Sequence, residues 1–375
     1  PRHYLLLVGS NAEMRAGSGA FLSVGVLDTA AGSFELKPTT ASGDLLLQKG
    51  VPITDADLAA RWGWLEPNRE WRNLGVSPRF DVTAPLAARM WEARGGGPVD
   101  GVLALDPAAL RALLRAVGAV DVGGTRIDAE HVEDQVLHRQ YLDFPADADL
   151  GARREQLGAI AGASVTALAT RDWDPSVLAR GLGEAARGRH VLAWSARPEE
   201  EEGWIAAGID GSMTPDSLLV GVLNRGGNKL DRFLDVAADL DIRGRGSGQE
   251  AVLRLRLHNR APQGEPAYVV GPAPGSGAGE GVYLGILAVS LPGDARQGRI
   301  DGETSLAVVG ADGPSRVVAT SVSIPRGGDR VLTVRFGLPG GRHSLRVEPS
   351  ARLPAISWTD GSRRWTDGSA HTIRW

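Results

Sequence analysis

A change in hydrophobic periodicity near Asp216 constrains the fold of this chain more than any other feature of its sequence. Before this point, apolar runs typical of strands alternate with segments whose apolar residues recur at helical spacing. Beyond Arg232, short alternating runs recur between Gly, Pro and Asp residues, with no convincing helical pattern. We therefore predict two domains in the 375 residues: a layered α/β domain over residues 1–230 and an all-β sandwich of immunoglobulin-like size over residues 231–375.

The two patterns can be followed element by element. In the first part we expect strands at residues 4–8, 21–28, 33–36, 99–105, 190–194 and 218–223, and a strand and turn around residues 119–127. Helices are predicted at residues 55–64, 82–94, 107–117, 130–141, 150–171 and 175–187, with Asp106 and Asp128 as N-caps. In the second part we expect strands at residues 252–258, 283–290, 305–309, 317–324, 331–336 and 343–347.

Composition narrows the class of partner. Hydrophobic residues make up 42% of the chain and charged residues 23%, which is typical of a globular protein. The formal net charge of −4 gives no reason to expect a nucleic-acid partner. Only three of the 41 basic residues are lysines. We attribute the average arginine excess to a GC-rich genome, and keep phosphate binding open for particular arginines.

The absence of cysteine excludes disulfides and thiol chemistry, and fits the cytosol and bacterial export equally well. The chain has no apolar run of about eighteen residues and no basic segment followed by an apolar one. It begins abruptly in a strand-like run. We interpret it as an extracytoplasmic, cell-envelope protein whose N-terminal signal or membrane anchor has been removed.

A polar segment with several glycines follows the first strand-like run. Residues 11–21 read NAEMRAGSGAF and bring Asn11, Glu13 and Arg15 close together in the sequence. A loop on the end of a buried strand is where α/β proteins usually place ligand contacts. Gly17 and Gly19 would allow a close backbone approach. The local pattern alone favours a solvated turn over a site.

Two further segments are rich in arginine. Residues 67–80, PNREWRNLGVSPRF, lack periodicity. They form either a functional loop or a loop whose aromatic side chains pack on the core. The candidate ligand-binding residues in this segment are Arg69, Arg72 and Arg79. Residues 153–156 read RREQ in the first turns of a predicted helix, and His138 and Arg139 end the helix before it. Arginines oppose the dipole of a first helical turn unless an anion binds there. Pairing with Asp147 or Asp149 is the alternative.

The chain contains no GxSxG elbow, no Walker loop and no GxGxxG after a strand. His131, Asp134 and His138 share a helical face and could bind a metal, but no second ligand motif supports this. The remaining chemistry is electrostatic. A carboxylate such as Glu13 would hold Mg²⁺ or act as a base, while arginines neutralise phosphates.

Several motifs resemble those of a known group of proteins. YLLLVGSNAEMRAGSGAF, NREWRNLGVSPRF, VDGVLALDPAAL and GIDGSMTPDSLLVGVLNRGGNKLD resemble an uncharacterised group of membrane-anchored extracellular proteins from GC-rich Gram-positive bacteria, which usually begin YLLLxQNNAELRxTGGF. That group is distantly similar to the LytR-CpsA-Psr phosphotransferases, which move glycopolymers from a polyprenyl-pyrophosphate carrier onto peptidoglycan. VDGVLALDPAALRALLRAVGAVDV and DLGARREQL carry this second similarity.

The resemblance implies roles for particular residues. Glu13 and Arg15 fall near an Arg-x-x-Asp pair that binds magnesium and pyrophosphate, so they are the implied catalytic residues and Glu13 the implied Mg²⁺ ligand. The residues implied to contact the carrier's phosphates are Arg153, Arg154 and Gln156, and, more weakly, His138 and Arg139. Two departures stand out: Asn11 and Glu13 occupy the neighbourhood of a missing aspartate, and Arg79 stands where the group usually has Asp.

The sequence thus predicts a glycopolymer phosphotransferase-like protein with a LytR-CpsA-Psr-like α/β domain, whose partners are a polyprenyl-pyrophosphate glycan, cell-wall glycan and, through its anchor, the membrane. An alternative is a non-catalytic envelope scaffold or glycan-binding protein, in which Trp62, Trp64 or Trp71 stacks on sugar rings, although tryptophan is more often used in core packing. A hydrolase of phosphate esters or glycans is a third possibility, which no carboxylate pair in the sequence supports.

Overall fold

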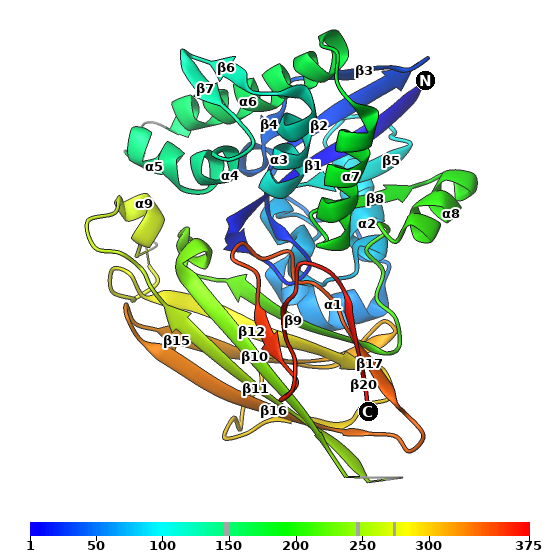
Figure 1. Cartoon of the computed structure of the whole chain (residues 1–375), viewed down its shortest axis with the longest axis vertical. Coiled ribbons are helices and arrows are strands. Elements are labelled where there is room, and N and C mark those ends of the chain that lie inside the picture. The colour runs from blue at the N-terminus through cyan, green and yellow to red at the C-terminus, as the bar shows by residue number, and fades with distance from the viewer. Residues whose placement is uncertain (146–149, 245–247, 273–274) are drawn as a thin grey trace.

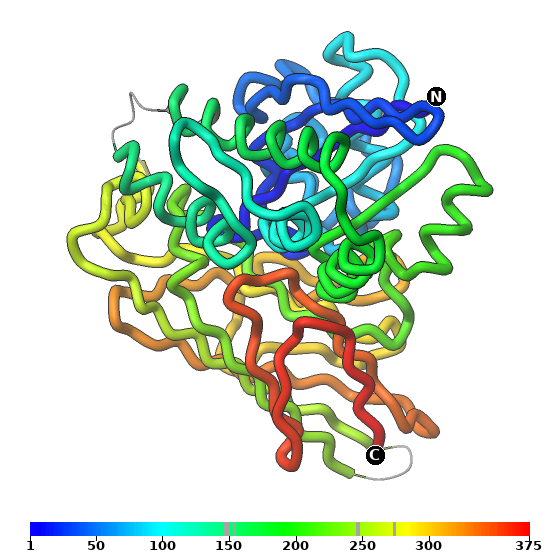
Figure 2. The backbone as a smooth tube through the Cα atoms, turned by 45° about the horizontal axis from the view of Figure 1, so that its top comes forward, coloured from blue at the N-terminus to red at the C-terminus, as the bar shows by residue number. Residues whose placement is uncertain are grey.

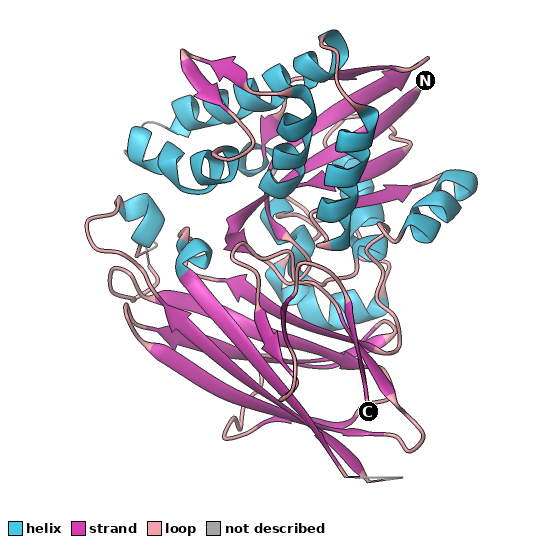
Figure 3. Cartoon of the chain, viewed as in Figure 1, coloured by secondary structure: helices cyan, strands magenta, loops and turns pink. Residues whose placement is uncertain are grey.

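The computed structural model describes residues 1–145, 150–244, 248–272 and 275–375. A mixed α/β region is followed by a strand-rich region, and the two lie directly against each other (Figures 1 and 3). This confirms the predicted change from alternating helices and strands to a region composed mainly of strands. Within the described residues, no helix is both long and apolar enough to cross a lipid bilayer.

The first region is built on a six-stranded sheet of order β3-β2-β1-β5-β8, with β4 attached to β2. β1 pairs in parallel with β5, and the remaining pairs are antiparallel. The strands are β1 (Arg2–Met14), β2 (Gly19–Ala30), β3 (Ser33–Leu36), β4 (Thr40–Ala41), β5 (Gly101–Leu105) and β8 (Val191–Ser195). A separate hairpin consists of β6 (Val120–Val122) and β7 (Thr125–Ile127).

Helices cover this sheet. One apolar face of the sheet, which includes Leu5 and Val102, packs on α2 through Ala84 and Met90. In Figure 1, α3, α6 and α7 lie in front of the sheet. The helices are α1 (Ala56–Trp62), α2 (Phe80–Ala93), α3 (Pro107–Val117), α4 (Val132–Asp134), α5 (Gln140–Asp143), α6 (Leu150–Thr170), α7 (Pro175–Arg187) and α8 (Pro198–Ala207), with a π-helical turn at Gln135–Arg139 and a 3₁₀ segment, η3, at Trp71–Val76.

Local signals explain where several helices begin and end. The carboxylates of Asp55, Asp106 and Asp174 accept hydrogen bonds from the first turns of α1, α3 and α7, and Asp128 accepts from the backbone before α4. Gly118 ends α3 with a φ of 81°, a conformation that favours glycine.

The second region consists of two six-stranded sheets of order β13-β16-β11-β10-β18-β19 and β14-β15-β12-β9-β17-β20. Leu253, Val334, Val220 and Leu287 lie in the core that the two sheets share. Its elements are β9 (Ser217–Asn224), η6 (Leu230–Phe233), β10 (Leu234–Arg243), β11 (Gln249–Asn259), α9 (Ala267–Val270), β12 (Tyr283–Pro292), β13 (Arg296–Ile300), β14 (Val308–Asp312), β15 (Ser315–Ile324), β16 (Asp329–Leu338), β17 (Ser344–Val347), β18 (Ser357–Thr359), β19 (Arg364–Thr366) and β20 (His371–Arg374).

The second of these sheets is buried on both faces. Side chains on its outer face, including Ile286 and Ala319, belong to the same core as Phe21 and Trp62 of the first region. Figure 2 shows the C-terminal segment, in red, passing directly beneath the helices of the first region. The two regions therefore share an apolar core.

The structure corrects several local expectations. Residues 11–14 continue β1, so the predicted loop is reduced to a short turn before β2 begins at Gly19. The strand predicted at residues 218–223 exists as β9, but it pairs with β12 and β17 of the strand-rich region although it precedes residue 230. Helices α8 and α9 and strands β4, β10, β13, β18, β19 and β20 were not predicted.

Candidate functional site

The end of β1 and the turn after it lie at the junction of the two regions. The turn is closed by a hydrogen bond from Arg15 N–H to Ser18 O. Gly17 N–H donates to Gly75 O in η3, and a Cβ on Gly17 would lie only 2.8 Å from Ser77 O. Every residue from 11 to 20 is buried. The turn is thus packed against η3, and the interpretation of this segment as a solvated loop is wrong.

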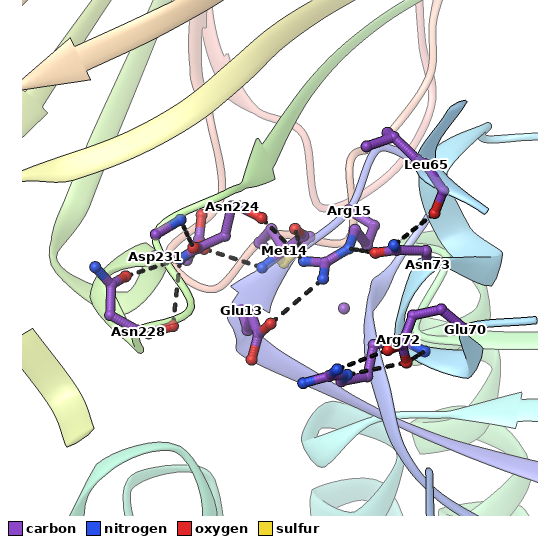
Figure 4. Close-up of polar contacts among 12 residues, drawn as sticks. Glu13, Met14, Arg15, Leu65, Glu70, Arg72, Asn73, Asn224, Asn228 and Asp231 are labelled. Atoms are coloured by element: carbon purple, nitrogen blue, oxygen red, sulfur yellow. Dashed lines mark hydrogen bonds and ion pairs between the residues drawn. The ribbon is translucent and has the colours of Figure 1, made fainter. Parts of the chain in front are cut away.

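Glu13 is the buried carboxylate of the site, and both of its oxygens contact cations. Lys229 Nζ lies 2.6 Å from Oε2, and Arg15 Nη2 lies 3.3 Å from Oε1 (Figure 4 shows the Arg15 contact). Burial would raise the pKa of Glu13, but Lys229 and Arg15 outweigh it and lower the pKa to about 2. Glu13 is therefore ionised at neutral pH. Because an efficient general base has a pKa near the working pH, Glu13 is a poor base there.

Lys229 comes from the strand-rich region and is only 3% exposed. Its Nζ lies 5.3 Å from the ring centre of Tyr268 and 5.9 Å from that of Tyr141. Burial would lower the pKa of Lys229, but Glu13 and the two tyrosines raise it, so the ammonium stays charged. The guanidinium carbon of Arg153, from α6, lies 4.3 Å from the same Tyr268 ring centre. Tyr268 is thus close to two cations that come from different regions.

Arg72 approaches Glu13 from η3 (Figure 4). Glu70 accepts hydrogen bonds from Arg72 Nε at 2.9 Å and Nη2 at 2.6 Å, and the Arg72 charge further lowers the Glu13 pKa. With Arg72 balanced by Glu70, the two cations Arg15 and Lys229 share the single charge of Glu13. We call the following residues the basic cluster: Glu13, Arg15, Arg72, Arg153, Lys229 and Tyr268.

A second buried carboxylate, that of Asp231, accepts hydrogen bonds from the end of β1 and from the strand-rich region. Asp231 Oδ2 accepts hydrogen bonds from Met14 N–H and from Asn224 Nδ2, each at 2.9 Å. Asp231 Oδ1 accepts from Arg352 Nη1 and from the Tyr283 hydroxyl, also at 2.9 Å each. The last residue of β1 is therefore tied through η6 to the C-terminal segment. Breaking this network would leave several buried polar groups without partners.

Asn11, a predicted ligand-binding residue, lies apart from the basic cluster. Its Nδ2 donates to Asp106 Oδ2 at 2.8 Å and to Ala351 O at 2.7 Å, and the side chain is fully buried. Asn11 thus joins β1 to the start of α3 and to the C-terminal segment.

Arg79 and Arg69 also hold segments of the chain together. Arg79 is buried between Asp312 Oδ1, at 2.9 Å from Nε, and Asp55 Oδ1, at 2.6 Å from Nη2. Arg79, which stands where the resembling group usually has an aspartate, therefore links Asp55, the N-cap of α1, to Asp312 at the end of β14. Arg69 Nε donates to Leu47 O at 3.0 Å. These contacts give both arginines a structural role and lend no support to ligand binding.

The other residues predicted to contact the carrier's phosphates do not lie together. Arg153 lies in the basic cluster, whereas Arg139 and Gln156 line a different cavity of about 620 Å³. Arg139 Nε contacts Asp134 Oδ2 at 2.8 Å, and His138 Nε2 lies 3.0 Å from Glu265. The side chain of Arg154 lies outside the described residues, as do Asp147 and Asp149.

The residues around Glu13 do not fit a magnesium ion. Mg²⁺ binds several oxygen ligands at short range, and both oxygens of Glu13 already contact cations. In the part of the chain that the structure describes, no group of three or more His, Asp or Glu side chains is arranged to hold a metal. His138 lies 3.9 Å from Asp134 and 3.0 Å from Glu265, but His131 pairs with Asp128, so among the described residues the three side chains do not form one group.

The three candidate tryptophans for sugar binding differ in exposure. Trp62 and Trp71 are fully buried and donate from Nε1 to Asp312 Oδ2 and Leu45 O. Trp64 is 54% exposed, with the Arg225 guanidinium carbon 5.9 Å from its ring centre. Of the three, only Trp64 is exposed to solvent.

Comparison with known proteins concerns mainly the first region. Residues 1–141 match the family described as "Protein of unknown function (DUF4012)". This match includes Glu13, Arg15 and Arg72, and it ends before Arg153 and Lys229. None of the curated proteins matches the chain.

Among solved structures, the chain is similar to the Lin1025 protein from Listeria innocua. The identity is 10% and the TM-score 0.27, over 56% of this chain and 79% of that one. A similarity this weak carries no argument about fold or function. The relationship to the LytR-CpsA-Psr phosphotransferases stays a prediction.

Sequence reasoning missed Lys229, Tyr268, Asp231 and Arg352. One signal pointed to Lys229: it is one of only three lysines in a chain that otherwise uses arginine, and it lies in a quoted motif, GGNKLD. Asp231 ends the same motif, whereas Tyr268 and Arg352 lie in segments with no distinctive local pattern. Their roles arise only where the strand-rich region meets the end of β1.

Proposed function

We propose that this protein binds a polyprenyl-pyrophosphate-linked glycan at the cell envelope and transfers the glycan to a cell-wall acceptor. The observation that carries the proposal is the basic cluster. Arg15 and Lys229 share one carboxylate, Glu13, and Arg153 lies against the same Tyr268 ring as Lys229. A pyrophosphate carries several negative charges, and guanidinium groups bind phosphate oxygens through paired hydrogen bonds.

The proposal extends to the fold and the location. The first region would be a LytR-CpsA-Psr-like domain and the second an immunoglobulin-like sandwich. The protein would act outside the cytoplasm with a membrane anchor, because the carrier lipid resides in the membrane. The junction between the two regions, where the basic cluster lies, would receive the carrier's phosphates.

In the transfer step, an acceptor hydroxyl attacks the phosphorus that bears the glycan. The bond from that phosphorus to the bridging oxygen breaks, and the carrier leaves as polyprenyl monophosphate while the hydroxyl proton passes to solvent. Arg15 and Lys229 would stabilise the negative charge that develops on the phosphate oxygens. Glu13, with its low pKa, would position these two cations instead of accepting the proton.

Replacement of Arg15 tests the proposal. A charged contact to phosphate contributes about 1.5–3 kcal/mol, so Arg15→Ala should weaken binding of a short-chain polyprenyl pyrophosphate about tenfold or more. Calorimetric titration measures the affinity, and circular dichroism checks the fold. The matched control is Arg254→Ala, whose side chain is 57% exposed on β11. Equal affinities of the wild type and Arg15→Ala would contradict the assignment.

A glycan-binding scaffold without catalysis is the second candidate, and the exposed ring of Trp64 beside Arg225 favours it. A scaffold would bind soluble cell-wall glycan fragments with an affinity that falls in Trp64→Ala and is unchanged in Arg15→Ala. It would also release no polyprenyl monophosphate from a lipid-linked glycan. Release of that product by the wild type would favour the transferase.

A further inference from the structure

A cavity separate from the basic cluster lies between α3, α7 and the C-terminal segment. Its volume is about 240 Å³. In Figure 1 the C-terminal segment, in red, runs beneath α3 and α7. The charged and ionisable residues that line it are Arg111, Arg115, Glu184, His190, Arg352 and Asp367.

His190 is held in one orientation in this cavity. Its Nδ1 lies 2.6 Å from Asp106 Oδ2, and that oxygen also accepts a hydrogen bond from Asn11 Nδ2 at 2.8 Å. The second oxygen of Asp106 accepts from Ala108 N–H at 2.9 Å. Because the other partners of Asp106 are donors, Asp106 is a carboxylate and His190 Nδ1 carries a proton.

The other ring nitrogen of His190 is available. Nε2 makes no hydrogen bond within the part of the chain that the structure describes, and the His190 side chain is 11% exposed. Since Nδ1 is the fixed donor, Nε2 accepts a hydrogen bond when the ring is neutral and donates one when it is protonated. Burial would lower the pKa of His190, but Asp106 outweighs it and raises the pKa above the ordinary value.

The charges around His190 come from every element that packs on the cavity. On α3, Arg111 pairs with Glu133 at 2.9 Å, whereas Arg115 makes no ion pair or side-chain hydrogen bond among the described residues. On α7, Glu184 is exposed. In the C-terminal segment, Asp367 accepts hydrogen bonds from Ser350 and Ile356, and Arg352 is paired with Asp231. Arg115 therefore has no ion-pair partner among the described residues, and protonated His190, whose Nδ1 is paired with Asp106, still has its Nε2–H available to a ligand.

We propose that this cavity binds a small phosphate- or sulfate-type anion between His190 Nε2–H and the guanidinium groups of Arg111 and Arg115. Arg111 and Arg115 are four residues apart on α3, so they lie on the same face of the helix. Planar guanidinium groups bind tetrahedral oxyanions well. The proposal is independent of the glycan-transfer reaction, because it uses none of the residues of the basic cluster.

Sulfate is the probe that tests this site, since its charge does not change between pH 5 and pH 9. Calorimetric titration of the full chain with sodium sulfate should give one binding event that weakens as the pH rises through the His190 pKa. His190→Gln should abolish this pH dependence and weaken binding about tenfold or more at pH 5.5. Inorganic phosphate should bind the same site when the comparison is made at one fixed pH, because its own charge changes between pH 5 and pH 9.

Arg115→Ala supplies a second measurement that does not depend on a buried residue. It should weaken sulfate binding about tenfold, while Arg180→Ala, at an exposed arginine of α7 outside the cavity, should leave the affinity unchanged. Sulfate should also shift the NMR signal of the His190 ring, identified by its loss in His190→Gln. Absence of sulfate binding, or equal affinities of the wild type, Arg115→Ala and His190→Gln, would overturn the proposal.

Discussion

At the scale of single residues, the buried pair of Glu13 and Lys229 dominates the electrostatics of the candidate site. Lys229 depends on Glu13 for its counter-charge, and without Lys229 the Glu13 carboxylate keeps only the longer contact to Arg15, at 3.3 Å; a poorly paired charge is costly in a low-dielectric interior. Lys229→Met should lower the free energy of unfolding by about 3–5 kcal/mol in urea titrations at pH 7. Lys37→Met, at a lysine that is 44% exposed, should lower it by less than about 1 kcal/mol.

The double variant separates loss of charge balance from loss of packing. In Glu13→Gln/Lys229→Met both charges of the pair are absent, but buried Arg15 also loses its carboxylate, so part of the lost stability should return. A double variant as unstable as Lys229→Met would show that packing of the lysine stem, and not its charge, accounts for the effect.

The same pair predicts how stability depends on pH. The pKa of Glu13 is about 2 in the folded protein, against an ordinary value of 4.5, so the unfolded chain takes up its proton first as the pH falls. The stabilisation by ionised Glu13 is therefore present above about pH 4.5 and is lost as the pH falls towards 2. Urea titrations across this range should give a steeper loss for the wild type than for Glu13→Gln. Parallel curves would contradict the lowered pKa.

At the scale of elements, the caps of α3 and α7 provide a matched comparison. Asp106 and Asp174 each accept a backbone hydrogen bond from the first turn, at 2.9 Å and 2.8 Å. Asp106 additionally holds Asn11 and His190. Asp174→Ala should cost about 1 kcal/mol, the usual value of a cap. Asp106→Ala should cost about 2–4 kcal/mol, because buried Asn11 also loses a partner. Equal losses in thermal unfolding would show that the extra contacts add nothing.

Elements with local signals could be predicted from the sequence, and those that depend on distant partners could not. Helix α7 was predicted at its observed bounds, because residues 175–187 carry a helical pattern that begins at Pro175. Residues 11–14 look like a loop because they are polar, yet they continue β1 since Asp231, more than two hundred residues away, accepts from Met14 N–H. Strand β10 was missed because its Ala and Asp residues have weak strand preference.

The candidate site was predicted in part for the same reason. Glu13, Arg15 and Arg153 could be found from motifs and from an unfavourable placement of arginine at a helix start. That Lys229 and Tyr268 join them could not be predicted, because contacts across the junction leave no trace in local periodicity. Arg79 shows the converse, since a conspicuous arginine in an irregular segment proves to be a buried link to Asp312.

At the scale of the whole molecule, one apolar core contains residues from both regions. Phe21 and Trp62 of the first region pack in the same core as Ile286 and Ala319 of the second. We therefore expect one cooperative unfolding transition. Trp62 and Trp71 are buried in the first region, so their fluorescence changes when that region unfolds. This fluorescence change should occur at the same urea concentration as the change in far-ultraviolet circular dichroism of the whole chain. Two separated transitions would show that the regions unfold independently.

The contacts between the end of β1 and the strand-rich region also determine how this chain can be shortened or recombined. The segment that matches a family ends at residue 141, but Glu13, Met14 and Asn11 take their partners from Lys229, Asp231 and Ala351. A gene fragment for residues 1–141 would encode these three residues without those partners, and we expect its product to be insoluble. Exchange of C-terminal regions between relatives should succeed only where the donor brings the lysine and the aspartate with it.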